Sequence, residues 1–174
     1  MIGRILIGGT LVLAVLAGAA LYYLQVYAYY VELPAEGAEV TLVSLATGEA
    51  EPIAFEDFRG IDADSSPLRY RACFTVPASL AMLTETYEMA VAEPRVGPGW
   101  FDCFDAAAIG EELAAGTALT FLGARDVQYG IDRIVAVTDD GRAYAWHEIN
   151  ACGEVVFDGN PAPETCPTPP EGLR

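Results

Sequence analysis

The pattern of hydrophobic and polar positions divides the chain into a short apolar stretch and a long mixed region. Residues 5–24 carry no charge and are almost all apolar. A helix of this length rises about 30 Å, which matches the hydrocarbon thickness of a bilayer. We therefore expect a transmembrane helix over 5–24, preceded by a cytoplasmic stub over 1–4 and followed by a body on one side of the membrane.

Charges on the two sides of the apolar run indicate its orientation. Arg4 lies directly before the run, whereas the first charged residues after it are acidic. These acidic residues are Glu32, Glu36 and Glu39. Positive charge near a membrane helix is retained on the cytoplasmic side. The sequence therefore predicts a single-pass inner-membrane protein with a cytoplasmic N-terminus and a periplasmic C-terminal domain.

Two interpretations of the apolar run remain open, a retained anchor and a cleaved signal peptide. Residues 17–19, Ala-Gly-Ala, match the A-x-A pattern of a cleavage site. The run, however, is longer than the apolar core of a normal signal peptide, and tyrosines typical of an aromatic belt follow it. These tyrosines are Tyr22, Tyr23, Tyr27, Tyr29 and Tyr30. The length and the tyrosines favour the retained anchor.

Small residues share one stripe of the expected membrane helix. Thr10, Ala14 and Gly18 are spaced four residues apart, and Ala17 lies beside them. Small side chains allow a second helix to approach closely, although alanine and glycine are common in membrane helices in any case. The stripe makes an integral membrane protein or complex a candidate partner.

Beyond the anchor, hydrophobic periodicity predicts strands, then two helices, then strands. The expected strands are 40–45, 52–58, 68–76, 118–123, 131–138, 142–149 and 154–157. The expected helices are 77–90, which begins at a proline, and a second helix that Asp105 caps and Gly116 ends. The clearest signal is the Asp-Asp-Gly turn at 139–141, which is typical of a hairpin. This order is typical of an α+β domain with an antiparallel sheet.

The expected domain boundaries follow from these elements. Residues 25–38 are predicted to form the aromatic belt and a linker, which contains Pro34 and Gly37. Residues 39–174 are predicted to form one domain that ends in an irregular, proline-rich tail. The roughly 145 residues beyond the anchor are enough for a buried core.

The four cysteines are Cys73, Cys103, Cys152 and Cys166. An even number on the oxidising side of a membrane favours two disulfides, and the absence of a CxxC motif disfavours a zinc site or a thioredoxin-like motif. Three pairings are possible. We favour Cys152–Cys166, which closes a short loop of about 15 residues worth about 3 kcal/mol and leaves Cys73–Cys103. The Cys152–Cys166 bridge would pin the tail.

The charge of the chain limits its partners. Asp and Glu number 25 against nine Lys and Arg, the formal net charge is −16, and every acidic residue lies beyond residue 30. Such a body is repelled by nucleic acid and by anionic lipid headgroups, so we expect no nucleic-acid partner. Basic partners or cations would suit it, although solubility alone accounts for the charge.

His147 is the only histidine, and it shares a face of the expected strand 142–149 with Ala143 and Ala145. A lone histidine can be a general base or a pH sensor, but a hydrogen-bonded structural histidine is the simpler interpretation. Catalysis by a Cys–His pair needs a free thiolate, which bridged cysteines do not supply. The sequence also contains no GxSxG motif of a serine hydrolase.

Two further clusters are candidate ligand sites. Arg69 and Arg71 share one face of the expected half-buried strand 68–76 and could hold a carboxylate or phosphate, although ion pairs within the acidic body are the expected arrangement. Asp62 and Asp64 begin like a calcium loop, but a proline and a cysteine replace its glycine and its bidentate glutamate. Nucleotide-binding glycine motifs are absent. We therefore expect no metal and no cofactor.

Three segments carry a resemblance to a known family: GAALYYLQVYAYY, SSPLRYRACF and YGIDRIVAVTDDGRAYAWHEINACGEVVFDG. With them the chain resembles an uncharacterised alphaproteobacterial family of single-pass, membrane-anchored proteins built on a domain of unknown function. The resemblance implies a membrane anchor but no activity and no site residues. Members are sometimes labelled histidine kinase. This chain does not favour that label, because it lacks an ATP-binding glycine motif and its histidine is expected within a strand.

The sequence favours a non-catalytic, membrane-tethered periplasmic protein, an accessory or assembly subunit of an inner-membrane complex. The first alternative is a periplasmic module that binds a small molecule or a cation. Its candidate ligands are Arg69, Arg71, His147, Asp62 and Asp64. The second alternative is an enzyme with a free cysteine near His147, which the even cysteine count disfavours.

Overall fold

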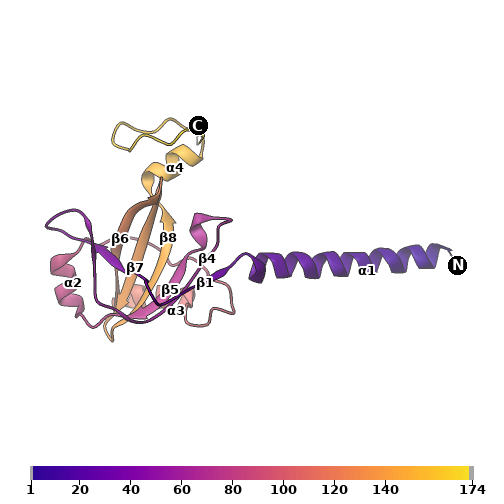
Figure 1. The fold of residues 1–174 in the computed structure, drawn as a ribbon, viewed down its shortest axis with the longest axis horizontal. Coiled ribbons are helices and arrows are strands. Elements are labelled where there is room, and N and C mark those ends of the chain that lie inside the picture. The colour runs from indigo at the N-terminus through magenta and orange to yellow at the C-terminus, as the bar shows by residue number, and fades with distance from the viewer. Residues whose placement is uncertain (1, 173–174) are drawn as a thin grey trace.

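A computed structural model describes residues 2–172, so Met1 of the expected stub and residues 173–174 of the expected domain lie outside the described part. A long helix, α1 (Ile2–Tyr23), projects away from a sheet-containing domain, and a π-helical turn, η1 (Leu24–Ala28), joins the two (Figure 1). Together they form a stretch long and apolar enough to cross a membrane, and α1 is exposed from Gly3 to Tyr23.

The domain is built on a six-stranded antiparallel sheet with the strand order β1-β4-β5-β8-β7-β6. These strands are β1 (Val31–Leu33), β4 (Glu56–Asp62), β5 (Arg71–Thr75), β6 (Ala118–Gln128), β7 (Ile131–Thr138) and β8 (Arg142–Ile149). A separate hairpin pairs β2 (Thr41–Val43) with β3 (Ala50–Pro52). The α+β fold with an antiparallel sheet is thus confirmed, and its β7–β8 hairpin has the predicted bounds.

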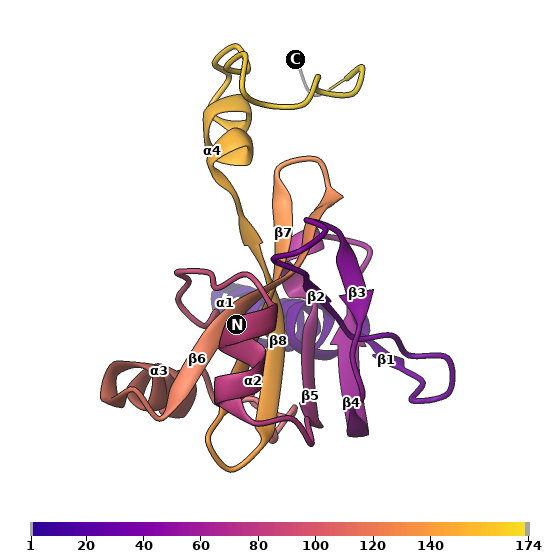
Figure 2. The same cartoon turned by 90° about the vertical axis from the view of Figure 1, so that its left-hand side faces the viewer.

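Both faces of the sheet are covered. One core cluster includes Leu83 of α2 (Leu80–Thr86), and the other includes Ile109 of α3 (Ala106–Ala115). Figure 2 shows α2 lying in front of β8. The prediction of a half-buried strand over 68–76 is therefore wrong: β5 lies inside the sheet, and its side chains are covered from both sides.

The helix predicted over 77–90 is shorter in the structure, where it is α2. It begins after Ser79 and not at Pro77, because Ser79 caps it by accepting a hydrogen bond from the Met82 amide. After α2 the chain is extended, and Met89 forms a bridge with Phe121 of β6. The second helix, α3, begins after the Asp105 cap and ends at Gly116 in the left-handed conformation, as predicted.

The prediction of a strand over 154–157 is wrong, because this segment belongs to the helix α4 (Ala151–Phe157). The Asn150 side chain caps α4 by accepting hydrogen bonds from two backbone amides. Gly153 packs so closely on the β6–β7 turn that an added Cβ would lie 2.2 Å from the Gly130 carbonyl oxygen. The Asn150 cap and the close contact between Gly153 and Gly130 outweigh the β propensity of Val155 and Val156.

Part of the predicted linker is structured. Val31–Leu33 forms β1, which pairs with residues 60–62 of β4 at one edge of the sheet. Only two residues, Tyr29 and Tyr30, separate η1 from this strand. The apolar helix α1 and the turn η1 therefore lead almost directly into the sheet instead of being joined to it by a flexible linker.

Candidate functional site

Arg71 is the first residue of β5 and is buried, with 4% of its surface exposed. Its guanidinium donates hydrogen bonds of 2.6–3.0 Å to the backbone carbonyls of Leu68, Tyr70, Arg95 and Val96. It also lies over the Phe104 ring, and burial lowers its pKa to about 10. The expected ion pair is wrong for this arginine, because four of its five N–H donors are bound to backbone carbonyls and hold two loops together.

Arg69 lies outside the strand, in the 3₁₀ turn η2 (Pro67–Arg69). Its guanidinium is 5.4 Å from the centre of the Tyr30 ring, and its buried Nη1 atom has no hydrogen-bond partner among the described residues. None of the ion pairs within residues 2–172 includes Arg69. The expected ion pair is therefore wrong here too, and the two arginines do not converge on one site.

His147 is buried, with 6% of its surface exposed, and its ring stacks on Tyr70 at a centroid distance of 4.5 Å. Its Nδ1 lies 2.7 Å from the Pro67 carbonyl oxygen, and its Nε2 lies 3.1 Å from Nε of Arg133. Because Arg133 can only donate, Nε2 accepts and Nδ1 carries the proton. The pKa of His147 is lowered to about 4, chiefly because the ring is buried and also because Arg133 and Arg71 carry positive charges. Both ring nitrogens are thus engaged within the domain.

Asp62 and Asp64 lie at and just beyond the end of β4. The Asp62 carboxylate accepts a hydrogen bond from the Ala63 amide, and burial raises the pKa of Asp62. Within residues 2–172, no three side chains of histidine, cysteine, aspartate or glutamate are grouped to hold a metal ion. Among the described residues, the two aspartates are therefore not joined by a third carboxylate, histidine or cysteine.

The cysteines form the bridges Cys73–Cys103 and Cys152–Cys166, the pairing that the sequence favours, with Cα–Cα distances of 6.3 and 5.7 Å. All four lie in the described part of the chain, and none has a free thiol. The first bridge ties β5 to the loop before α3. Two disulfides indicate an oxidising compartment.

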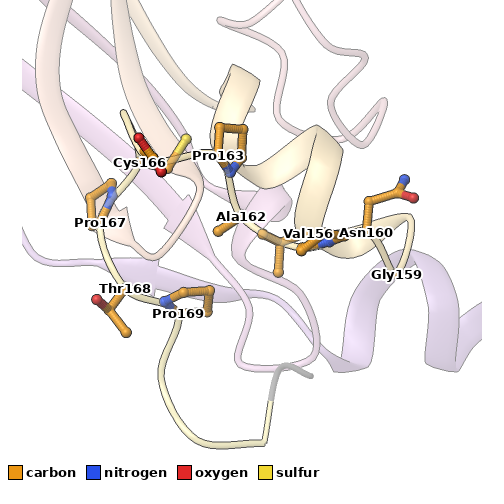
Figure 3. Close-up of a pocket in the computed structure, with 11 residues that line it drawn as sticks. Val156, Gly159, Asn160, Ala162, Pro163, Cys166, Pro167, Thr168 and Pro169 are labelled. Carbon is orange, nitrogen blue, oxygen red and sulfur yellow. The ribbon is translucent and has the colours of Figure 1, made fainter.

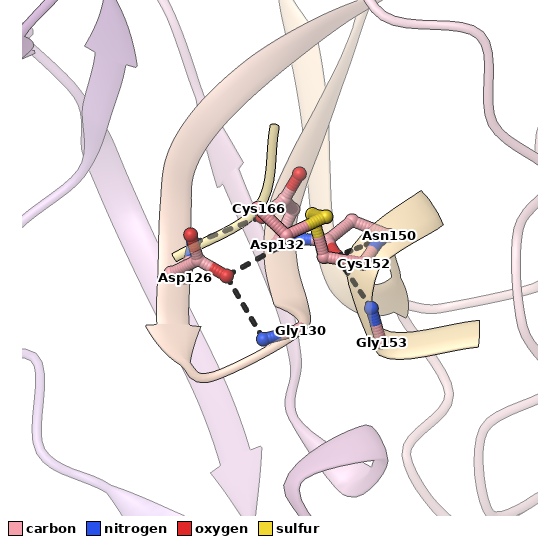
Figure 4. The surroundings of a disulfide bond; sticks show 7 residues. All are labelled: Asp126, Gly130, Asp132, Asn150, Cys152, Gly153 and Cys166. Carbon is pink, nitrogen blue, oxygen red and sulfur yellow. Dashed lines mark hydrogen bonds between the residues drawn. A yellow bond between two sulfur atoms is a disulfide. The ribbon is translucent and has the colours of Figure 1, made fainter. Parts of the chain in front are cut away.

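A polar cluster surrounds the second bridge (Figure 4). The Asn150 amide donates to the carboxylates of Asp126 and Asp132, and its oxygen accepts from the amides of Cys152 and Gly153. One side chain thus caps α4 and ties it to the end of the β6–β7 hairpin. The disulfide then holds the tail to the start of α4.

The helix–domain junction joins the end of the apolar helical segment to the domain and is formed by Val26, Tyr27, Tyr30 and Trp100. The Trp100 indole N–H donates a 2.7 Å hydrogen bond to the Val26 carbonyl, which the π-helical turn leaves accessible. The Trp100 ring stacks on Tyr27 at 6.2 Å and meets Tyr30 edge-on at 5.8 Å. Sequence reasoning missed this junction. The tyrosines after the apolar run and a tryptophan in a Pro/Gly loop were its only signals.

Two hollows in the surface of the described residues are large enough to hold a small ligand. One, of about 760 Å³, lies between α4 and the tail and is lined mostly by prolines and small residues, among them Pro163, Pro167 and Pro169 (Figure 3). The other, of about 400 Å³, lies beside β7 and β8. Four carboxylates line it: Glu88, Asp132, Glu148 and Glu154. Neither hollow includes His147, Arg69 or Arg71 in its lining.

The expected small-residue stripe lies on an exposed helix. The Thr10 hydroxyl donates to the Leu6 carbonyl within α1, so it is already satisfied. Ala14, Ala17 and Gly18 are exposed, and a Cβ added at Gly18 would meet nothing within 4 Å. The stripe therefore makes no contact with the domain in the described part of the chain.

Comparison with curated proteins gives no match, and comparison with solved structures gives none either. A family model does match, over residues 40–167, and its description is "Family of unknown function (DUF6446)". The matched region begins at β2, runs through all four bridged cysteines and ends one residue after the last of them. Since it covers well over half of the chain, the protein belongs to the DUF6446 family of unknown function.

Proposed function

We propose that the protein is a non-catalytic accessory or assembly subunit that α1 tethers to an inner membrane as a single span, with its disulfide-bonded domain in the periplasm. Its partner in this proposal is an integral membrane protein or complex. The resemblance to alphaproteobacterial single-pass proteins supports a single membrane span for this chain. The positive charge before α1 and the acidic residues after it support the orientation.

The observation that carries the proposal is the state of α1. It is apolar and exposed along its length, and its end is bonded to the domain through Val26 and Trp100. A partner helix that packs against α1 would therefore also place the domain at the membrane surface, which is what an assembly subunit requires.

The side chains best suited to chemistry support a non-catalytic role, because each has a structural task. The four cysteines are bridged, both nitrogens of His147 are hydrogen-bonded, and the Arg71 guanidinium is bound to backbone carbonyls. A general base or a nucleophile must be reachable by its substrate. Using these groups in catalysis would require breaking the contacts that hold the domain together.

A periplasmic cation-binding module is a second candidate, and one observation favours it. The hollow of about 400 Å³ is lined by four carboxylates, although no three of them are grouped to hold one metal ion. Glu88 is also paired with Arg125, and Glu148 lies 3.6 Å from Arg95. Titration of the full chain with Ca²⁺ in detergent tests this candidate. A calcium-dependent rise in the unfolding temperature would favour it over the assembly role.

The test of the assembly role uses two substitutions of equal size. Gly18→Leu fills the small-residue stripe, whereas Gly9→Leu adds the same side chain on the opposite side of α1, about two and a half turns away. Both glycines have open space around them, so both variants should insert and fold. We expect Gly18→Leu to abolish co-purification of the partner from mild detergent and Gly9→Leu to retain it, because close helix approach needs small residues. Equal co-purification in both variants contradicts a helix-mediated role.

Retention of the anchor is tested separately. The intact mass of the membrane-extracted protein should correspond to a chain that starts at Met1 or Ile2. A mass that starts near Ala20 would mean that the apolar run is a cleaved signal peptide, and the tethered role would fail.

A further inference from the structure

The position of Val26 along the helix sets the depth of the helix–domain junction. If Ile5 lies at one edge of a hydrocarbon core about 30 Å thick, Leu24 lies at the other edge, because each residue of a helix rises about 1.5 Å. Val26 then lies about 3 Å beyond that edge. This depth is within the polar layer, which brings the bilayer to about 40–45 Å in total.

Trp100 must lie at the same depth, since its indole is hydrogen-bonded to the Val26 carbonyl. The ring is half-buried, and Tyr27 and Tyr30 pack around it. Tryptophan and tyrosine are enriched at this level of a membrane because their rings are apolar and their N–H and O–H groups are polar. Trp100 is far from the anchor in sequence, so the fold itself brings a domain residue into the aromatic belt.

A guanidinium lies next to this belt. Arg69 is stacked over Tyr30, its Nη1 is a buried donor without a partner, and it belongs to none of the ion pairs in the described residues. Arg59 differs, because it lies over Phe101 on the same side of the domain but is neutralised by Asp102 at 2.9 Å. Among the described residues, Arg69 is thus left with an unmatched charge beside the tyrosines that follow the apolar helix.

The remaining charges of the domain limit what Arg69 can bind. Glu32, Asp62 and Asp64 lie on neighbouring segments, and the chain as a whole carries a formal charge of −16. Long-range attraction to an anionic surface is therefore excluded, and contact must come from tethering followed by a short-range hydrogen bond. A phosphodiester fits, because its two free oxygens match the fork of a guanidinium.

We propose that the helix–domain junction rests in the headgroup layer of the bilayer and that Arg69 binds the phosphodiester of a phospholipid there. The inference rests on the proposed function only in requiring that α1 stays in the membrane. Such contact fixes the height of the domain and its rotation about α1. It would also present the same face of the domain to every partner that lies beside the helix.

The depth of Trp100 is measured by fluorescence quenching in vesicles. The full chain is reconstituted in phosphatidylcholine that is brominated either near the headgroup end or near the terminal end of its acyl chains. The other tryptophan, Trp146, is fully buried in the domain core, so the wild type minus Trp100→Phe isolates Trp100. A Trp146→Phe variant gives the same signal directly. We expect the Trp100 signal to lose more intensity with the shallow bromines than with the deep ones, and the Trp146 signal to change with neither.

The phosphate contact is measured by native mass spectrometry of the full chain released from detergent with added phosphatidylglycerol. Diacylglycerol with the same acyl chains, which lacks the phosphate, is the lipid control. We expect one bound phospholipid and an approximately tenfold weaker affinity in Arg69→Gln, the effect of one lost charge-assisted hydrogen bond. Arg125→Gln is the matched protein control, because Arg125 lies on β6 at the opposite edge of the sheet. It should bind as the wild type does.

The outcomes separate this inference from the proposed function. If the chain floats with vesicles but bromines leave Trp100 unquenched, the domain stands off the bilayer and the inference is overturned, while the tether remains. Equal lipid binding by Arg69→Gln and wild type overturns the phosphate contact. A chain that does not float with vesicles refutes the retained anchor and both proposals with it.

Discussion

His147 offers the sharpest test of the domain's electrostatics. It is held as a neutral ring between the Pro67 carbonyl and Arg133, with Tyr70 stacked against it. Protonation would remove the acceptor that Arg133 uses and place two cations side by side. The folded state therefore favours the neutral form, and the pKa of His147 falls from its ordinary value of about 6.5 to about 4.

The sign and size of the pH effect follow from this shift. Above pH 6.5 the histidine is neutral in both the folded and unfolded states, so its full contribution to stability is present. As the pH falls below 6.5, the unfolded state binds the proton first and stability declines until the folded pKa is reached near 4. A change of one pKa unit corresponds to about 1.4 kcal/mol, so the expected loss in the free energy of unfolding is about 3 kcal/mol.

The assay is urea unfolding of the full chain in an uncharged detergent, with its disulfides intact, between pH 7.5 and pH 4. His147→Gln is the comparison, because glutamine can donate and accept but does not titrate. At pH 7.5 the variant should be less stable by about 1–2 kcal/mol, the size of a lost buried hydrogen bond. The difference should shrink on acidification and reverse by pH 4, where the wild type has lost more.

Subtraction of the two curves removes other titrations. Burial raises the pKa of Asp62 and of Glu148, so their protonation adds stability as the pH falls, opposite to the effect of His147. Both carboxyl groups are present in the wild type and in the variant, so their effects on stability largely cancel in the difference. A difference that stays constant from pH 7.5 to pH 4 would refute the reasoning, because it would mean that His147 is solvated in the folded state and is available as a base.

Two further predictions concern the bridges and the glycine contact. Alkylation without reduction should leave all four cysteines unlabelled in mass spectrometry, and Cys73→Ala should lower stability more than Cys152→Ala. The chain-entropy values for their loops are about 4 and about 3 kcal/mol, and stoichiometric labelling of any cysteine would revive a thiol enzyme. Gly153→Ala should cost about 1–3 kcal/mol in denaturant unfolding, because its Cβ would overlap the Gly130 carbonyl. Gly110→Ala, in open space within α3, should instead stabilise by about 0.5–1 kcal/mol, and similar effects of the two changes would contradict the close packing.

The elements predicted correctly from the sequence are those fixed by local patterns. Alternation on both sides of an Asp-Asp-Gly turn is enough to specify the β7–β8 hairpin, and the Asp105 and Gly116 caps specify α3. The prediction of a strand over 154–157 failed because the conformation of this segment is decided by the Asn150 cap and by contact with Gly130. A four-residue pattern contains neither of these residues.

Most of the candidate site depends on contacts between distant residues. The carbonyl partners of Arg71 belong partly to a loop more than twenty residues away, so its charge pattern suggested an ion pair instead. The Trp100–Val26 hydrogen bond joins residues 74 positions apart. Hydrophobic periodicity gives the type of an element but not which loop will lie beside it, and the junction could therefore not be predicted.

The strand β1 determines where the chain can be shortened. Val31–Leu33 covers the backbone edge of β4 at 60–62, so a fragment that begins at residue 39 would leave that edge unpaired. An exposed sheet edge with free N–H and C=O groups recruits a strand from another molecule, which leads to aggregation. A soluble fragment must therefore keep β1 and the tyrosines before it. The strand that follows the apolar segment thus protects the domain from pairing with its own copies, apart from any role of that segment in the membrane.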